Sequence, residues 1–183
     1  MKKIIPFYIS MMALCAAFAL MAVMQACVGD KDEPEFSLEA GSPLPSFLVT
    51  LMNGEVFDTT GLQDAGVKNL LILFFNTDCS DCQRELPEMQ RLYDRIQNDE
   101  KFSRNTRMIC IAREENAAEI KDFWEKHDLT MPVSPQSDRK IYNLFATVGI
   151  PRLYLANTAT STITAAWPPS GAPSDVVFSL LRD

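Results

Sequence analysis

The sequence has one histidine and no glycine-rich phosphate loop. A copper chaperone of the two-cysteine type would need a histidine beside its cysteines, but His127 falls at the end of an expected helix, where a surface role is usual. A nucleotide cofactor is normally cradled by the backbone of a glycine-rich turn. We therefore expect neither a metal nor a cofactor.

Basic residues are also scarce. The chain has 17 Lys and Arg against 24 Asp and Glu, a formal net charge of −7. Residues 1–26 hold two of the lysines and no acid, which leaves 15 basic and 24 acidic residues and a charge of −9 for the remainder. Binding to nucleic acid needs a basic surface, and so does spontaneous adhesion to anionic lipid. The composition argues against both kinds of partner.

Five cysteines in 183 residues are too few for a disulfide scaffold. Cys15 lies in an apolar N-terminal segment, and Cys110 lies in an apolar strand pattern where a free cysteine behaves as a small core residue. Two others form the CSDC sequence from Cys79 to Cys82. In an exported protein such a pair can cycle between dithiol and disulfide, which predicts redox chemistry.

The N-terminus predicts export and lipidation. A basic start is followed by Ile4–Val23, a stretch without charge that is typical of a secretory signal or of an uncleaved membrane anchor. The sequence MQAC, ending at Cys27, resembles a bacterial lipobox, in which this cysteine receives lipid and becomes the new N-terminus. We expect a signal peptide over residues 1–26, with the anchor as the alternative.

The segment after Cys27 predicts a spacer. Residues 27–45 are polar, acidic and rich in Gly and Pro, as in a flexible tether, so we place the folded domain at 46–183. Lys31-Asp32-Glu33 resembles an acidic signal that sends some Gram-negative lipoproteins to the cell surface, and a solvated linker is the alternative. The expected location is the cell envelope outside the cytoplasm, lipid-anchored on the periplasmic face or on the cell surface.

The stretch from Asn69 to Pro87 dominates the domain. Leu70–Phe75 is a run of six apolar residues, typical of a strand covered on both faces. Cys79 follows four residues later, and after it apolar residues recur at helical spacing to about Asn98. Cys79 is therefore placed at a helix N-terminus, where unpaired N–H groups and the helix dipole favour its thiolate form. Cys82, one turn later, is close enough to form a disulfide with it.

Further elements follow from periodicity and turn residues. Strand patterns on either side of Asn53-Gly54 predict a hairpin, and Ser174 is a plausible N-cap for a final helix. Glu114 and Glu115 have the pattern of solvated loop charges. The order β-β-β-α-β-α-α-β-β-α indicates an α/β domain with a mixed sheet. The expected elements are strands at 46–52, 55–57, 70–75, 107–112, 152–156 and 162–166, and helices at about 80–98, 117–127, 141–145 and 174–181.

From about Gly41 to the C-terminus the chain resembles the TlpA/ResA-like family of thiol–disulfide oxidoreductases, which have a thioredoxin fold and are tethered outside the bacterial membrane. The CxxC motif after an apolar strand, the following Glu85-Leu86-Pro87 and the later Gly149-Ile150-Pro151 carry this resemblance. It implies a three-layer thioredoxin-like fold, with a mixed central sheet flanked by helices, an N-terminal β-hairpin extension and an extra helix insertion.

The resemblance also implies roles for individual residues. Cys79 would attack a substrate disulfide and Cys82 would resolve the mixed disulfide. The Ile150–Pro151 bond would be cis, face the cysteines and pair with substrate backbone. Glu85 would influence Cys82 or relay a proton, with a solvated glutamate as the alternative. The implied partners are protein disulfides, a membrane thiol-electron donor and the membrane itself through the lipid, and we expect a monomer.

Some residues depart from the family pattern. Asp78 replaces the tryptophan common before the first cysteine, and Arg152 replaces the threonine common after the proline. Arg152 would either bias which substrate segments dock or point to solvent. Asp78 and Asp81 oppose the helix dipole at Cys79, and a less stabilised thiolate makes the pair a better reductant. We therefore expect a reductase.

Two alternatives use the same fold. A peroxiredoxin-like antioxidant needs Pro and Thr or Ser at fixed positions before its cysteine, and these positions hold Ile72 and Asn76. A redox-inactive surface lipoprotein could use the fold as a binding module, with the CxxC as a static disulfide. Loss of reactivity at either cysteine would mark that second case.

Overall fold

The computed structural model describes residues 35–169 and 171–182. The predicted signal peptide, Cys27 and the first part of the predicted tether lie outside the described residues. Within these ranges, no helix combines the length and the apolar character that crossing a membrane requires.

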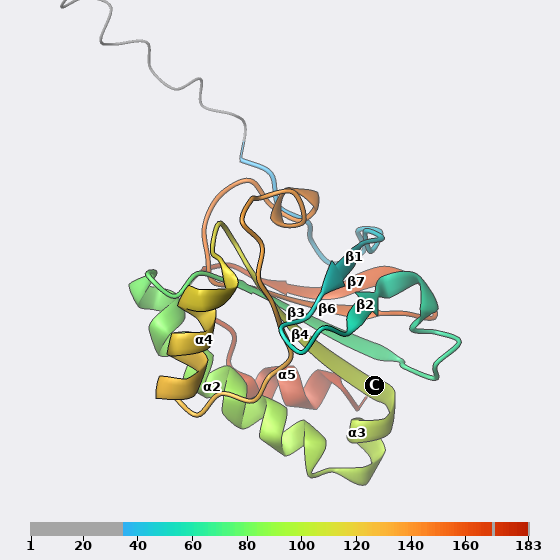
Figure 1. Cartoon of the computed structure of the whole chain (residues 1–183). Helices are drawn as coiled ribbons and strands as arrows, with labels where there is room; N and C mark the ends of the chain where they lie inside the picture. Colours follow the sequence, from blue (N-terminus) through green and yellow to red (C-terminus); the bar gives the residue numbers. More distant parts are fainter. Residues whose placement is uncertain (1–34, 170, 183) are drawn as a thin grey trace, which may run out of the picture. The chain divides into compact units, whose positions relative to one another are not determined.

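A five-stranded mixed sheet forms the centre of the domain (Figure 1). β3 runs parallel to β4 and antiparallel to β6, and all seven of its residues are buried. The apolar run predicted this burial because a central strand is covered on both faces. The strand order is β5 (Val133–Ser134), β4 (Thr106–Ala112), β3 (Asn69–Phe75), β6 (Arg152–Asn157) and β7 (Thr162–Trp167).

Neighbouring residues of β3 face opposite layers. The Phe74 ring packs against aromatic residues from the loop after β5 and from β6, whereas the Phe75 ring lies 5.0 Å from that of Trp124 in α4. Arg95 of α2 stacks 3.7 Å over the Phe178 ring of α5, and these two helices run along one side of the sheet (Figure 1). The helices are α2 (Ser80–Gln97), α3 (Glu100–Asn105), α4 (Ala117–Lys126) and α5 (Ser174–Leu180), with 3-10 turns η2 (Thr59–Gly61) and η3 (Tyr142–Leu144).

The predicted hairpin is confirmed as an antiparallel pair, β1 (Leu48–Thr50) and β2 (Val56–Asp58). Gly54 takes a positive φ of 86° in the turn, a conformation that glycine adopts without a steric penalty. The α/β class with a mixed sheet, the hairpin and the extra helix α4 all agree with the sequence prediction.

Three sequence predictions need correction. Residues 35–45 were placed in a free tether, but Leu38, Gly41 and Leu44 donate backbone hydrogen bonds of 2.8 Å to the domain, so this segment is part of it. Pro173, and not Ser174, is the N-cap of α5, and it makes no side-chain capping bond. The short elements α3 and β5 were not predicted, since neither is long enough to show a period.

Candidate active site

Cys79 occupies the junction between the central strand and α2. It is the N-cap of the helix, with extended backbone angles, and its Sγ accepts the backbone N–H of Cys82 at 3.4 Å. An acceptor at this position satisfies one of the N–H groups that a helix start leaves free. The site therefore directs a backbone donor and the positive end of the helix dipole at the sulfur, which is partly exposed.

The two cysteines have different surroundings. Cys82 is fully buried, and burial, followed by the hydrogen bond with Cys79, raises the pKa of its thiol. Cys79 thus presents the accessible sulfur, and Cys82 lies behind it as a protonated thiol. Cys110 is also fully buried, with its sulfur 3.8 Å from Met131 Sδ, and burial raises the pKa of its thiol, so its predicted place in the core is confirmed.

The loop before Cys79 is held by bonds within its own turn and by bonds to neighbouring elements. The Oδ1 of Asn76 accepts the Asp78 N–H at 2.8 Å, and its Nδ2 donates to the Arg113 carbonyl at 3.0 Å. Gln83 reaches back from α2 and donates to the Thr77 carbonyl at 2.7 Å. These bonds fix the turn that brings the chain from β3 into α2.

Glu115 is a buried part of this site, which corrects its prediction as a solvated loop charge. It is 4% exposed, and its carboxylate accepts the Thr77 N–H at 3.0 Å and also the Thr77 hydroxyl. Burial raises the pKa of this carboxyl, and the hydrogen bonds from Thr77 oppose that shift. Sequence reasoning missed this residue because its burial depends on a partner 38 positions earlier.

The acidic residues beside Cys79 are less uniform than the sequence indicates. Asp81 forms an ion pair with Arg84 at 2.5 Å, which offsets its charge, although both side chains are at least half exposed. An exposed pair of this kind contributes little to stability. Asp78 is exposed and joins the turn through its backbone N–H. The charge that opposes the helix dipole is therefore mainly that of Asp78.

The second loop of the site carries the predicted cis-proline. The Ile150–Pro151 peptide bond is cis, as predicted, and the Cys79 thiol donates to the Ile150 carbonyl at 3.7 Å. Residues 71 positions apart in the sequence therefore meet at one sulfur. The structure brings four predicted site residues together here: Cys79, Cys82, Ile150 and Pro151.

Gly149 lets this loop approach its neighbour closely. Its φ is +77°, and a Cβ built there would lie 2.5 Å from Cγ of Pro169. Its carbonyl accepts the Tyr142 hydroxyl at 2.7 Å. Any larger residue at this position would both strain the backbone and displace Pro169.

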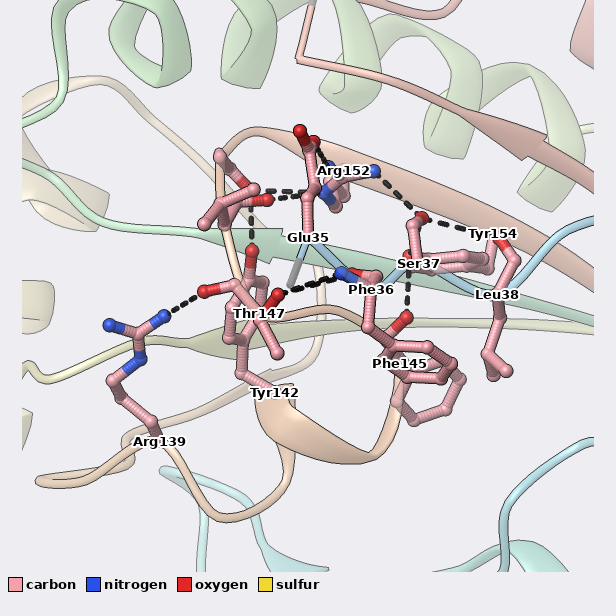
Figure 2. A network of polar contacts seen from close by, with 12 residues as sticks. Glu35, Phe36, Ser37, Leu38, Arg139, Tyr142, Phe145, Thr147, Arg152 and Tyr154 are labelled. Atoms are coloured by element: carbon pink, nitrogen blue, oxygen red, sulfur yellow. Dashed lines mark hydrogen bonds and ion pairs between the residues drawn. The ribbon is translucent and has the colours of Figure 1, made fainter. Parts of the chain in front are cut away.

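Arg152 does not point to solvent, which corrects one of the two predictions for it; the other, that it biases which substrate segments dock, stays a prediction. It is 6% exposed, and its Nε donates to the carbonyl groups of Val148 at 2.9 Å and Gly149 at 3.2 Å. Figure 2 shows its guanidinium between this loop and Ser37 and Glu35 of the N-terminal segment. No local sequence pattern indicates these partners.

Glu85 is predicted to influence Cys82 or to relay a proton, and the structure places its carboxylate against the loop before α5. Its Oε1 accepts the Ala172 N–H at 2.9 Å, and a Cβ at Gly171 would lie 2.8 Å from its Oε2. Among the described residues it has no hydrogen bond to Cys82. Glu85 thus fixes the segment between β7 and α5, which also contains Pro169, the neighbour of Gly149.

Within the described ranges, no group of three or more His, Cys, Asp and Glu side chains is arranged to hold a metal ion. His127 is the C-cap of α4 and stacks on Phe123, with 4.2 Å between the ring centroids. A partly exposed cysteine at a helix start, a buried cysteine one turn later and a facing cis-proline define the thiol–disulfide oxidoreductases with a thioredoxin fold.

Comparison with known proteins agrees with this class. The AhpC/TSA family model matches residues 40–163, so the chain belongs to that family. Its relatives include the thiol-disulfide oxidoreductase ResA of Bacillus cereus, 26% identical over 147 residues that cover 80% of this chain and 78% of that protein. ResA of Bacillus thuringiensis subsp. konkukian is 26% identical over 121 residues, which cover 66% of this chain and 65% of that protein. The predicted TlpA/ResA-like resemblance is confirmed, and the chain is a thiol–disulfide oxidoreductase.

Solved structures share the fold. StoA from Bacillus subtilis superposes with a TM-score of 0.59 at 20% identity, over 76% of this chain and 97% of that one. The pneumococcal exposed lipoprotein thioredoxin Etrx1 from Streptococcus pneumoniae gives a TM-score of 0.60 at 15% identity, over 75% of this chain and 98% of that one. At these identities the likeness establishes the thioredoxin-like fold.

Proposed function

We propose that the protein is an extracytoplasmic, lipid-anchored reductase of protein disulfides, with Cys79 as the nucleophile and Cys82 as the resolving thiol. One observation carries the proposal. The partly exposed Cys79 sulfur accepts the Cys82 N–H at 3.4 Å and lies 3.7 Å from the Ile150 carbonyl, with a buried second thiol one turn behind it.

The reaction takes place in two exchanges. The Cys79 thiolate attacks one sulfur of the substrate disulfide, a Cys79–substrate disulfide forms, and the other substrate sulfur leaves as a thiolate. Cys82 then gives up its proton and attacks the Cys79 sulfur, which releases the second substrate thiolate. The substrate gains two electrons, the Cys79–Cys82 pair becomes a disulfide, and a membrane thiol donor returns two electrons to it.

The burial of Cys82 supports this division of labour. Because burial raises the pKa of its thiol, Cys82 stays protonated while Cys79 attacks, and it becomes reactive only when a base or the leaving thiolate takes its proton. Glu85 has a positioning role in this scheme, since its carboxylate is engaged by Ala172. The Ile150 backbone beside Pro151 docks an extended substrate segment next to Cys79.

The location is supported by the N-terminal sequence, in which an uncharged stretch precedes Cys27. A structural neighbour is described as an exposed lipoprotein thioredoxin. Globomycin sensitivity and metabolic palmitate labelling of the full chain test the anchor: a wild-type chain that takes up label and a Cys27→Ala chain that does not would support it. Equal labelling of the two chains would contradict it.

The reduction potential of the Cys79–Cys82 pair tests the direction of electron flow. The purified protein would be equilibrated against glutathione and dithiothreitol buffers and its thiols counted by alkylation. A potential near or below about −220 mV supports the reductase, whereas a value near about −120 mV makes the protein an oxidase. A pair that does not titrate would overturn the catalytic proposal and favour a binding module.

A further inference from the structure

The chain entering the domain is bound to the cis-proline loop. Residues 35–38, here called the N-terminal strap, run beside the segment that leads to Ile150 (Figure 2). The Phe36 N–H donates to the Thr147 hydroxyl at 2.9 Å, and the Thr147 N–H donates to the Phe36 carbonyl at 2.9 Å. The Leu38 N–H donates to the Phe145 carbonyl at 2.8 Å. The strap is therefore hydrogen-bonded along the segment that leads into the cis-proline loop, which faces Cys79.

The buried side chain of Arg152 links the strap to the cis-proline loop. Its side chain is 6% exposed, and its Nη1 donates to the Ser37 hydroxyl at 2.9 Å while its Nε donates to the Val148 and Gly149 carbonyls. The charge is partnered by Glu35, 3.6 Å from Nη2. Glu35 is 71% exposed, so this ion pair contributes little, and the hydrogen bonds dominate.

A guanidinium suits this place because its donors are fixed in one plane. It can bond two successive carbonyls of the loop on one side and a hydroxyl of the strap on another, which an ammonium group cannot do at once. The two carbonyls are partly buried, and Arg152 is the donor that they share, so removal of Arg152 would let the loop shift. The carbonyls it holds directly precede Ile150 and Pro151.

We propose that Arg152 is a positioning residue for substrate docking, which locks the Val148–Pro151 loop to the N-terminal strap so that the Ile150 backbone is preformed for pairing with a substrate segment. This inference rests on the proposed function. It makes the strap, which leads towards the predicted anchor, a structural part of the substrate site. Arg152 acts through the loop and does not touch the reacting sulfurs.

Steady-state reduction of a disulfide-bonded peptide, with dithiothreitol as electron source, tests the inference on the full chain. R152M removes the donors at similar side-chain length, R152K restores one charged donor, and S37A removes the strap partner together with its contact to the Tyr154 hydroxyl. R91M is the matched control, because Arg91 is an exposed arginine of α2 paired with Glu88. The rate of Cys79 alkylation by iodoacetamide reports the sulfur without any need for docking.

We expect R152M to raise KM about tenfold, the loss that removal of charged hydrogen bonds produces, with kcat within about twofold of wild type. S37A raises KM about threefold, since the strap loses one of the Arg152 bonds and the contact with the Tyr154 hydroxyl, and R152K falls between wild type and R152M. The alkylation rate of Cys79 stays within about twofold of wild type in every variant, and R91M retains the wild-type KM.

A folded R152M with the wild-type KM would overturn the inference, and so would a change in alkylation rate, which would place the effect at the sulfur. If R152M does not fold, S37A and R152K decide: unchanged KM values in both contradict the inference. A wild-type protein that does not reduce the peptide would instead refute the proposed function, and the inference with it.

Discussion

Two loops meet at the Cys79 sulfur, and they are stabilised in different ways. The redox loop, residues 76–82, joins a strand to a helix start, and it is held by the Asn76 turn, by α2 and by Glu115, which accepts the Thr77 N–H. The cis-proline loop, residues 148–152, contains no helix start. Arg152 bonds the Val148 and Gly149 carbonyls within the loop and ties them to Ser37 of the N-terminal strap. Ser37 lies 115 positions from Arg152.

The two loops therefore affect different properties: the redox loop affects the reactivity of the Cys79 sulfur, and the cis-proline loop affects the docking of substrate in the proposed mechanism. The redox loop sets the surroundings of the sulfur through a helix start, an element that a short sequence can encode. In the proposed mechanism the cis-proline loop receives the substrate backbone, and its position is fixed by contacts with Pro169, Tyr142 and the N-terminal strap. Changes in the first loop should alter chemistry, whereas changes in the second should alter binding or stability.

The largest effect is expected from the redox loop. C79S removes the nucleophile, so peptide disulfide reduction should fall to the rate of the uncatalysed exchange. C110A is the matched control, because Cys110 is a buried core thiol far from solvent, and its activity should stay near that of wild type. Activity retained in C79S, or abolished in a folded C110A, would contradict the assignment.

Gly149→Ala should destabilise the protein by distorting the cis-proline loop. Alanine would have to adopt a positive φ, and its Cβ would lie 2.5 Å from Pro169. We therefore expect the free energy of unfolding, measured in urea, to fall by about 2–3 kcal/mol. Gly66→Ala is the control, since Gly66 has φ +75° and nothing within 4 Å of its Cβ position. It should lose only about 1 kcal/mol. Equal losses would show that the approach to Pro169 has no importance.

Glu85→Ala should have a smaller effect, because it destabilises the segment between β7 and α5 that packs against the cis-proline loop. Loss of the hydrogen bond from Ala172 should speed hydrogen exchange at this amide about tenfold, and unfolding free energy should fall by about 1 kcal/mol. Glu85→Gln keeps an acceptor oxygen and should retain protection. Glu88→Ala, an exposed glutamate of the same helix, serves as the control. Unchanged exchange in Glu85→Ala would argue that the carboxylate has another partner.

The smallest effect is expected from Glu115→Gln, which should change how the stability of the protein depends on pH. Burial raises the pKa of Glu115 above its ordinary value of 4.5, so its contribution to stability is complete below that value and is lost as pH rises through the folded-state pKa. As pH rises through the folded-state pKa, wild type should therefore lose stability relative to Glu115→Gln.

Urea unfolding across this pH range measures the difference. Glu125→Gln, at an exposed glutamate of α4, should show no such trend. A wild-type stability that instead rises relative to Glu115→Gln would mean that the Thr77 hydrogen bonds outweigh burial.

The contrast between the loops also explains what could be predicted from the sequence. β3, α2 and the cysteine pair are local: an apolar run, a helical period and a CxxC spacing are all visible within about 30 residues. The cis bond before Pro151 was predicted from a family motif and is confirmed. The first kind of signal is local, and the second depends on motifs that can be recognised in the sequence without knowledge of the fold.

Residues with long-range partners were predicted wrongly. Arg152 and Glu115 are charged, and a charged side chain is expected at the surface unless a partner is known. Their partners, Ser37 and Thr77, lie far away in the sequence, and no periodicity indicates them. The strap was predicted to be part of a free tether for the same reason. Its Gly-, Pro- and acid-rich surroundings are typical of a linker, and the sequence does not indicate its hydrogen bonds to residues 145 and 147.

The most direct test of the redox pair is to trap its intermediate. In Cys82→Ser the resolving thiol is absent, so reaction with a disulfide-bonded peptide should leave one peptide half attached to Cys79, as a single adduct located by mass spectrometry after peptide mapping. The Cys79→Ser protein should form no adduct under the same conditions. An adduct on Cys110, or none in Cys82→Ser, would contradict the account that Cys79 attacks first and Cys82 resolves.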